Sequence, residues 1–410
     1  MGTTVEEKMQ LNIDKSSWKL VKFGDVVFEP KAVVKNLQDE GVQHVVGLEH
    51  IDTEDIHLKR FASIEESTTF TKKFAKDDVL FGRRRAYLKK AAQAPFGGIC
   101  SGDITVFRAK NDLLPALLPF VVNNAKFFDY AIKHSAGGLS PRVKFKDLAN
   151  YSFLLPPKDQ QAQLAELLWA MDEVIERERE VLDRFKEIKN ITSNKLLSEG
   201  LGHGDFIMSS IGRIPKNWKV TKFQSIIHIM KSGLSRRIVS EDIGIPVIIS
   251  GNIQEGRLDS KDLKYWYRND PQGANTDNYI LDEGDILLCF INSLSQIGKV
   301  CIFKNLEREA IYTTNLFRIV PNKEVDNRYL YYVLSSNKIQ QKILQITKPA
   351  VNQASFTKED FLRIKIAIPP SDEQQDIVKI FEQIEYNIDS VQDKITASKA
   401  LQKSLINQIF

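Results

Sequence analysis

One pattern of residues occurs twice in this chain, about 200 residues apart, and this repeat constrains the fold more than any other feature. Trp18, followed by Lys-Phe four residues on, returns as Trp218 with the same Lys-Phe. An Asp-(Val/Ile)-Leu segment at Asp78 returns at Asp285. Several such matches in one order indicate an internal duplication, so we expect two similar halves.

The distance between matching residues grows along the repeat and then stays constant. It is 200 residues at the tryptophans, 207 at the aspartates, and 213 at the pairs Pro156-Pro157 and Pro369-Pro370, from which it holds to the C-terminus. Insertions therefore collect in the first part of each copy. This pattern is typical of a variable surface on a constant frame, although ordinary loop drift in a duplicated scaffold would also produce it.

The first part of each copy mixes strand and helix signals. Short apolar runs bounded by Gly, Asp or Pro, such as IPVIISG and EGDILLCFI, predict strands. One helix is expected after the strands, around LLPFVVNNAKFFDYAIK in the first copy and RYLYYVLSSNKIQQKIL in the second. The expected fold class is α+β, with two tandem mixed α/β domains.

A different helical pattern follows each Pro-Pro. Apolar residues recur at steps of four and three, which is the heptad signature of a coiled coil. We expect two helices, each about 60 Å long, to pair antiparallel within the chain; an intermolecular coiled coil is the competing interpretation. A second apolar line is expected to widen the seam of the first helix at Leu167, Val174, Val181 and Ile188. The predicted seam residues are Leu164, Leu168, Met171, Ile175, Leu182, Ile377, Phe381, Ile384, Ile388, Val391 and Ile395.

Local signals set the limits of these segments. Asp159 and Asp372, just after the prolines, suit helix starts. Gly200, Gly202 and Gly204 are expected to end the first helix and to form a linker. The predicted order is a domain over residues 1–155, a helix over 156–200, a second domain over 201–368 and a second helix over 369–410.

Composition narrows the class of protein. The net charge of +4 permits nucleic-acid binding but does not argue for it. Cys100, Cys289 and Cys301 form no C-x-x-C pair, so the sequence supports neither a zinc ribbon nor a disulfide framework. With no signal peptide and no apolar run long enough for a bilayer, we expect a reduced cytoplasmic protein.

Catalytic motifs are missing from the sequence. It contains no G-x-x-x-x-G-K-[ST] loop for a nucleotide-driven motor and no N-P-P-Y-like motif of amino-methyltransferases. The six histidines form no H-x-x-x-H cluster. We therefore expect no catalytic site and no metal site on this chain.

The segments around the two Pro-Pro pairs carry a resemblance to a known family. LLPPKDQQAQLAELLWAMDEVI and AIPPSDEQQDIVKIFEQIEYNI resemble the P-P-x-x-E-Q-x-x-I signature of type I restriction-modification specificity subunits. IGRIPKNWKV resembles the opening of their target recognition domains, and KDDVLFGRRR and EGDILLCF resemble a G-D-(I/V)-L strand within them. The first copy departs from the signature at Gln160-Gln161, where Glu-Gln is usual. The resemblance covers nearly the full chain.

This resemblance implies a DNA-binding subunit without catalysis. Each recognition domain would read one half of a bipartite site in double-stranded DNA, and the helix pair would set the spacer. Two methyltransferase subunits would dock on the helices and bring S-adenosylmethionine, and motor-nuclease subunits would bring ATP and Mg²⁺. No cofactor is expected on this chain. Two other interpretations remain open: a self-contained DNA enzyme with two recognition domains, and a coiled-coil scaffold that binds proteins.

Loops rich in hydrogen-bond donors are the candidate DNA contacts, because Arg, Lys, Asn and Gln read bases and phosphates. In the first domain the candidates are Arg83, Arg84, Arg85, Lys89 and Lys90 after a strand end, and His134, Arg142 and Lys144 after the helix. In the second domain they are Lys231, Ser232, Arg236, Arg237, Lys264, Arg268, Lys348, Asn352 and Gln353. The small residues Ser232-Gly233 would allow close approach to a phosphate. A solvated basic turn at Arg83–Arg85, and a strand with alternating buried rings at Lys264–Arg268, are the alternatives.

Overall fold

The computed structural model describes residues 13–35, 41–63, 69–202, 204–304, 306–351 and 353–410. The chain forms two compact units: unit 1 comprises Met1–Val181 and Val391–Phe410, and unit 2 comprises Leu182–Ser390. The boundary falls inside both long helices, whereas the sequence prediction placed domain limits at their ends. The reason is that the two ends of each helix pack into different hydrophobic cores.

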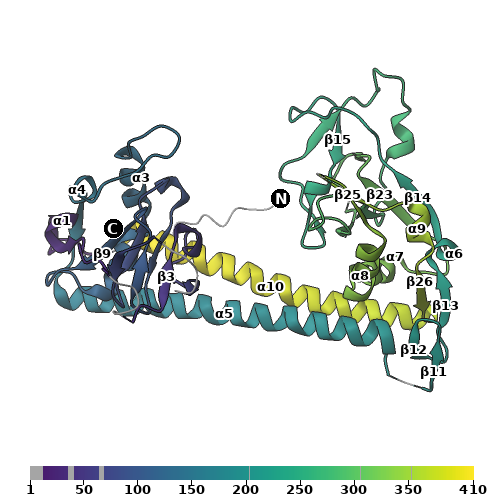
Figure 1. Cartoon of the computed structure of the whole chain (residues 1–410), viewed down its shortest axis with the longest axis horizontal. Helices are drawn as coiled ribbons and strands as arrows, with labels where there is room; N and C mark the ends of the chain where they lie inside the picture. Colours follow the sequence, from purple (N-terminus) through teal and green to yellow (C-terminus); the bar gives the residue numbers. More distant parts are fainter. Residues whose placement is uncertain (1–12, 36–40, 64–68, 203, 305, 352) are drawn as a thin grey trace. The chain divides into compact units, whose positions relative to one another are not determined.

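Unit 1 contains two four-stranded sheets and a two-stranded ribbon (Figure 1). The first sheet has the order β2 (Val27–Phe28), β9 (Ile104–Ala109), β6 (Val79–Gly82), β7 (Ala91–Gln93). The second has the order β4 (Ala62–Ser63), β3 (His44–Val46), β8 (Gly98–Cys100), β5 (Lys72–Phe74). The ribbon joins β1 (Lys19–Lys22) to β10 (Ser152–Leu155).

Unit 2 repeats this plan. Its four-stranded sheet has the order β14 (Ile227–Ser232), β23 (Leu316–Pro321), β19 (Ile286–Cys289), β21 (Val300–Ile302). A three-stranded sheet has the order β18 (Lys264–Trp266), β15 (Ile245–Ile248), β22 (Ile311–Tyr312), and the ribbon joins β13 (Lys219–Lys222) to β26 (Lys365–Ile368). Smaller pairs are β11 (Phe206–Ser209) with β12 (Gly212–Pro215), and β16 (Ile253–Gln254) with β17 (Arg257–Leu258). Matching strands in matching order confirm the duplication.

An ion pair explains why the Asp-(Val/Ile)-Leu segment repeats together with a Phe-Arg pair, which is Phe107-Arg108 in the first copy and Phe317-Arg318 in the second. In unit 1, Arg108 on β9 donates two hydrogen bonds, of 2.6 and 2.8 Å, to the buried carboxylate of Asp78. In unit 2, Arg318 on β23 lies 2.6 Å from Asp285. Each carboxylate also accepts a backbone N–H and so closes the turn before its strand. The repeated aspartate is thus a structural residue of each domain.

Each copy has more helices than the single one expected. In unit 1, α2 (Leu118–Val122) ends at Asn123, and the Asn124 side chain caps a separate helix, α3 (Ala125–Lys133). In unit 2, α7 (Asn327–Ser335) and α8 (Asn337–Ile346) are divided at the capping residue Ser336. Both capping residues have an extended backbone, which ends the preceding helix, and their side chains accept an N–H of the following helix that would otherwise lack a partner. Short helices complete the units: α1 (Phe23–Val26), α4 (Phe145–Leu148), α6 (Phe223–Ile226) and α9 (Lys358–Leu362).

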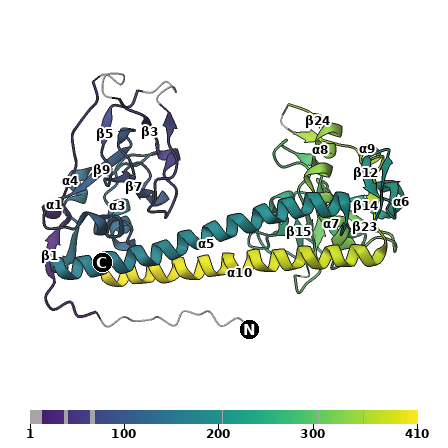
Figure 2. The same ribbon diagram turned by 90° about the horizontal axis from the view of Figure 1, so that it is seen from below.

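The two long helices are α5 (Lys158–Glu199) and α10 (Ser371–Ile409). In unit 1, Leu405 and Ile409 near the end of α10 share a core with Leu168 near the start of α5. In unit 2, Phe381 near the start of α10 shares a core with Leu196 near the end of α5. The helices therefore pair antiparallel within the chain, as the heptads predict (Figure 2). No helix among the described residues is long and apolar enough to cross a membrane.

The expectation that a second apolar line widens the seam is wrong. Among the predicted seam residues, Leu168, Ile175, Leu182, Ile377, Phe381 and Ile395 are buried, and Leu164, Met171, Ile384, Ile388 and Val391 are half-buried. The side chains of the second line stay between 42% and 50% exposed at Leu167, Val174, Val181 and Ile188. One partner helix covers only a narrow stripe of α5, so the adjacent line faces outward.

A buried glutamine joins each domain to the start of its long helix. Gln161 donates to the carbonyls of Pro156 and Asp112, both at 2.9 Å, and its side-chain oxygen accepts the Leu114 N–H. Gln374 bonds in the same way to the carbonyls of Pro369 and Glu324 and to the Asp326 N–H.

The repeated tryptophans reach the same turns. The indole N–H of Trp18 donates to Gln160 at 2.7 Å, and that of Trp218 donates to Glu373 at 3.1 Å. The glutamine at position 160 keeps the acceptor that glutamate supplies in the second copy, so this departure from the family signature preserves the contact. The signature after Pro-Pro is therefore a set of tethers between helix and domain.

We predict that Gln374→Met destabilises the protein while Gln375→Met does not. Methionine fills similar space but leaves a buried N–H and two buried carbonyls unpaired, which costs about 2 kcal/mol. The neighbouring Gln375 is exposed, so its substitution should change the free energy of unfolding by no more than about 0.5 kcal/mol. The measurement is the free energy of unfolding of the full chain in urea. Equal values for the two variants would show that the buried amide is not a tether.

Candidate nucleic-acid interface

The arginine-rich connection after β6 is held against two other segments of unit 1. The Arg83 N–H donates to the Asp103 carbonyl, and the Arg83 carbonyl accepts the Val143 N–H, both at 3.0 Å. The Arg85 N–H donates to the Pro141 carbonyl at 2.8 Å. The structure thus brings together the two loops that the sequence proposed separately in the first domain.

Asp103, in the turn between β8 and β9, joins the arginines of these loops. Its carboxylate accepts from Arg142 Nε at 2.7 Å and from Arg84 Nη1 at 3.2 Å, and Arg84 Nη2 also donates to the Ser140 hydroxyl. The hydrogen bond from Arg142, followed by the one from Arg84, holds the pKa of Asp103 below its ordinary value. Two of the predicted DNA-contacting arginines are therefore fixed by an internal carboxylate.

The other first-domain candidates lie in different surroundings. Arg85 and Lys144 are exposed, and the exposed His134 ring stacks on Tyr130 with 3.9 Å between ring centres. Lys90 donates to the Leu48 carbonyl, and Lys89 lies 3.4 Å from Glu54. These two lysines belong to the contact with the loop around residues 48–54 and are not brought into the Asp103 cluster.

Most of the predicted cations of the second domain already have internal partners. Arg236 donates twice to Asp270, at 3.0 and 2.6 Å, and this contact holds the pKa of Asp270 far below its ordinary value. Arg268 bonds to Asp277, Glu309 and Thr276. The donors of these two arginines are thus used in hydrogen bonds within the domain.

Some of the remaining candidates near these arginines also have internal partners, and others are exposed. Lys231 donates to the Asn278 carbonyl and lies over the Tyr279 ring, and Lys264 donates to the Ser240 hydroxyl. Ser232 is half-buried at the end of β14, and Arg237 is exposed. The expected close approach at Gly233 is to protein, because a side chain there would meet the Tyr312 carbonyl. Of the alternative interpretations, the strand with alternating buried rings holds, because Trp266 is buried on β18 while Tyr265 is half-buried and Tyr267 is 45% exposed.

In unit 2, the loop after α8, residues 347–355, forms the same backbone pairing as the loop after α3 in unit 1. β24 (Lys348–Pro349) pairs with β25 (Ala354–Ser355), and β25 pairs with β20 (Ile291–Asn292). Unit 1 has the same ladder as isolated bridges, Ala136 to Arg142 and Arg142 to Arg84. Lys348 and Gln353 are exposed on this element, and Asn352 lies outside the described residues.

The sequence prediction missed residues 291–295, which take the place of the arginine-rich connection. The 207-residue distance between Asp78 and Asp285, applied to Arg84 and Arg85, leads to Ile291 and Asn292. Ser293 and Ser295 are exposed, with their hydroxyls 3.2 Å apart. The repeat itself was the available signal, but the absence of basic residues in this segment hid it.

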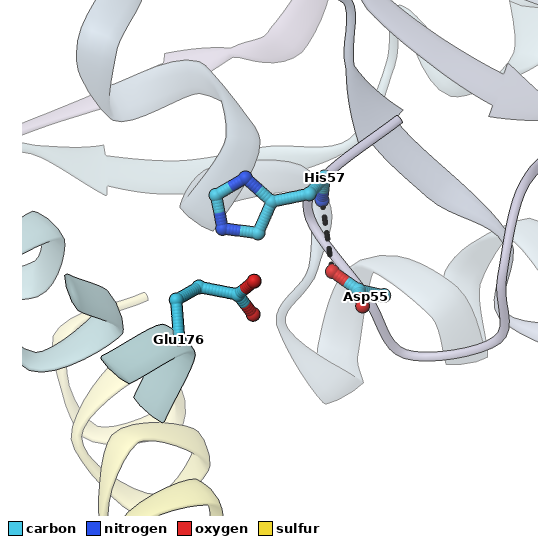
Figure 3. Close-up of side chains that lie close together, drawn as sticks. All are labelled: Asp55, His57 and Glu176. Atoms are coloured by element: carbon cyan, nitrogen blue, oxygen red, sulfur yellow. Dashed lines mark hydrogen bonds between the residues drawn. The ribbon is translucent and has the colours of Figure 1, made fainter. Parts of the chain in front are cut away.

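A second polar cluster of unit 1 lies where the loop after β3 meets α5. The ligand-type atoms of Asp55, His57 and Glu176 lie within 4.8 Å of one another, and the backbone N–H of His57 donates to the Asp55 carboxylate (Figure 3). Arg179 donates to Asp55 at 2.8 Å and to Glu176 at 2.6 Å. Lys59 lies 2.7 Å from Glu176.

The cations in this cluster argue against a metal ion there. Arg179 and Lys59 already neutralise both carboxylates, and His57 Nε2 lies 2.5 Å from the buried Asp172. A metal would have to displace these partners, so we interpret the cluster as an ion-pair network between recognition domain and helix. Lys399, Lys403 and Gln402 extend it onto α10, where Lys403 pairs with Glu54 and Gln402 donates to Asp172.

Comparison with known proteins decides the family. Residues 15–186 and 215–398 each match the family described as type I restriction modification DNA specificity domain. The chain belongs to this family. It is a DNA-specificity subunit with two recognition domains, the part of such a system that selects sequence and carries no catalytic reaction.

Individual relatives agree with this assignment. The putative type I restriction enzyme MjaX specificity subunit of Methanocaldococcus jannaschii is 30% identical over 207 residues, which is 50% of this chain and 48% of that protein. The type I restriction enzyme EcoKI specificity subunit of Escherichia coli is 22% identical over 391 residues, covering 94% of this chain and 77% of that protein. This specificity subunit thus matches about half the length of the first relative and about three quarters of the second.

A solved structure supports the same fold. It comes from work on complex assembly and conformational transition of the type I R-M system, and it covers 96% of both chains with a TM-score of 0.58 and 19% identity. At that identity the likeness concerns the fold.

The His57 contact predicts that the stability of this specificity subunit depends on pH. The hydrogen bond to Asp172, with further attraction to Asp172, Glu176 and Asp55, raises the pKa of His57 against the effect of burial. A raised pKa means that the contact stabilises the fold fully below the unfolded value of about 6.5, and that this contribution is lost as pH rises through the folded value. Asp172, Glu176 and Asp55 act on the ring, and the cations Arg179, Lys59 and Lys399 interact with these carboxylates.

The matching variant is His57→Gln, which keeps an N–H donor but cannot carry a charge. We expect it to lower the free energy of unfolding by about 1 kcal/mol near pH 6, the usual size for a half-buried charged hydrogen bond. The difference should shrink toward pH 9. A difference that is independent of pH would show that His57 is uncharged in the folded protein.

Proposed function

We propose that this specificity subunit reads a bipartite DNA site, with one recognition domain on each half. The observation that supports this most directly is the duplicated three-segment element, Arg84–Arg142–Ala136 in unit 1 and β20–β25–β24 in unit 2. The backbone pairing is the same and the side chains differ. One scaffold used twice with different side chains suits a protein that reads two different half-sites.

The helix pair is proposed to set the spacer between the half-sites. α5 has 42 residues and α10 has 39. At about 1.5 Å per residue these are contour lengths near 60 Å. Half-sites on one side of B-DNA recur about every 34–36 Å, a separation that helices of this length can span.

The exposed apolar line on α5 is the proposed docking surface for a methyltransferase subunit. Leu167, Val174 and Val181 are 47%, 50% and 42% exposed at heptad spacing. A row of apolar side chains left open beside a filled seam is typical of a protein–protein contact. Two methyltransferase subunits would bring S-adenosylmethionine, and adenine would be methylated after being flipped into their active sites.

The rest of the proposed complex supplies the remaining cofactors. Motor-nuclease subunits would bring ATP and Mg²⁺, so this chain is proposed to hold no cofactor of its own. The complex would act in the cytoplasm, where its DNA substrate lies.

The decisive experiment maps adenine methylation in cells with and without this gene. We expect one split motif to be lost with the gene. Exchanging residues 18–155 for those of a relative should change only one half of that motif. A methylation pattern that is identical with and without the gene in a strain expressing the partners, or an exchange that alters both halves, would contradict the proposal.

The docking surface has its own test. Val174→Glu with Val181→Glu should weaken co-purification of the methyltransferase subunit about tenfold or more, because two charges would enter an apolar contact. Glu166→Gln with Glu180→Gln is the matched control, since it also changes two charges on exposed positions of α5. Both variants should keep the helical circular-dichroism signal. Equal retention of the partner by the two variants would place the contact elsewhere.

A further inference from the structure

The three-segment elements of the two units, here called the reading elements, have the same backbone pairing but differ in charge. In unit 1, the segments 83–85 and 134–144 carry four arginines and one lysine, and no acidic residue. In unit 2, the segments 291–295 and 347–355 carry Lys348 as their one charged residue. A difference of this kind at matching positions indicates that the two half-sites are recognised by different contacts.

The arginines of unit 1 are not equivalent. Arg84 and Arg142 are held on the Asp103 carboxylate, and Arg83 is half-buried. Arg85 is exposed, and within the part of the chain that the structure describes its guanidinium makes no hydrogen bond or ion pair. The guanidinium of Arg83 makes no hydrogen bond or ion pair among the described residues either, but its Nε is buried, so Arg85 is the arginine of this cluster whose unpaired donors face solvent.

The backbone of Arg85 is held in an unusual conformation. Its φ angle is +54°, in the left-handed region that glycine and asparagine ordinarily occupy. Main-chain bonds hold it there: its N–H donates to the Pro141 carbonyl at 2.8 Å, and its carbonyl accepts the Leu88 N–H at 2.9 Å. A surface turn gains nothing in stability from an arginine at such a position, so the conformation of the turn does not account for the identity of the side chain.

We propose that Arg85 is a specificity-determining residue that reads a guanine in the half-site bound by the first recognition domain. A free guanidinium can donate two parallel hydrogen bonds to guanine O6 and N7, the most common specific contact to DNA bases. Asp103 acts as a positioning residue, because it fixes Arg84 and Arg142 beside the turn that carries Arg85. The inference rests on the proposed function and adds the base and the residue that reads it.

Unit 2 makes the inference asymmetric. The position equivalent to Arg85 is Asn292, whose amide donates to the Ser250 hydroxyl at 3.0 Å and whose oxygen accepts the Ser293 N–H. No arginine stands in segments 291–295 or 347–355. Changes at Arg85 therefore affect the guanine requirement of one half-site and leave the other unchanged.

The test uses the full chain co-expressed with its methyltransferase partner. Binding is measured to duplexes that carry the mapped motif and to duplexes with each single base change in the first-domain half-site. The parent protein should discriminate one guanine by roughly ten- to hundredfold. Arg85→Lys keeps the charge but cannot donate two parallel bonds, so its discrimination at that guanine should fall to within about threefold.

Two further variants separate reading from folding. Arg85→Gly removes the guanidinium and suits a φ of +54°, so it should lose the discrimination with no drop in melting temperature. Arg60→Lys is the matched control, an exposed arginine of the same unit that pairs with Asp52; it should keep the motif unchanged.

Three results would overturn the inference while leaving the proposed function in place. They are a first-domain half-site without guanine, full guanine discrimination by Arg85→Lys, which is the behaviour of a phosphate contact, and loss of discrimination in the other half-site. A parent complex that methylates no bipartite motif would instead refute the proposed function on which this inference rests.

Discussion

The buried amides of Gln161 and Gln374 hold each long helix against its domain, and the rest of each unit depends on this contact. Each makes three hydrogen bonds to main-chain groups at the point where a domain passes into a long helix. A buried amide must find partners for its donors and its acceptor, so this junction has one low-energy geometry. The tryptophans Trp18 and Trp218 stand near the start of each domain in the sequence, and their indole N–H groups donate to side chains in the same turns. Helix direction and domain orientation are thereby coupled in each unit.

This junction explains how a constant frame and variable reading loops can share one chain. The closing part of each copy, which contains the glutamine and the long helix, keeps its 213-residue register. Insertions fall upstream of the glutamine, among the strands and loops of each domain. The reading elements can then change their side chains, from arginines in unit 1 to amides and hydroxyls in unit 2, without disturbing the frame.

The distribution of charge shows why counting basic residues in a loop is a poor guide to DNA contacts. Arg236 and Arg268 looked as suitable as Arg85, yet both bond to carboxylates of their own domain. Asp270 lies 34 residues after Arg236 and Asp277 lies nine residues after Arg268, and only the folded loops show that these carboxylates face the arginines. A nearly balanced chain with a net charge of +4 has enough acidic residues to occupy most of its cations.

The sequence by itself indicated the duplication, several strands, the two long helices and the resemblance to the family, because heptad spacing, capping residues and the Pro-Pro signature act over a few neighbouring residues. Tertiary structure decided the rest. It showed that Asn124 and Ser336 divide helices expected to be continuous, and that Leu167 and Val174 face outward beside the seam. It alone distinguished Arg85 from Arg84 and Arg142, because the carboxylate that holds the latter two, Asp103, lies on a separate segment between β8 and β9. Whether a side chain is free depends on such contacts between distant segments, and these follow from sheet topology.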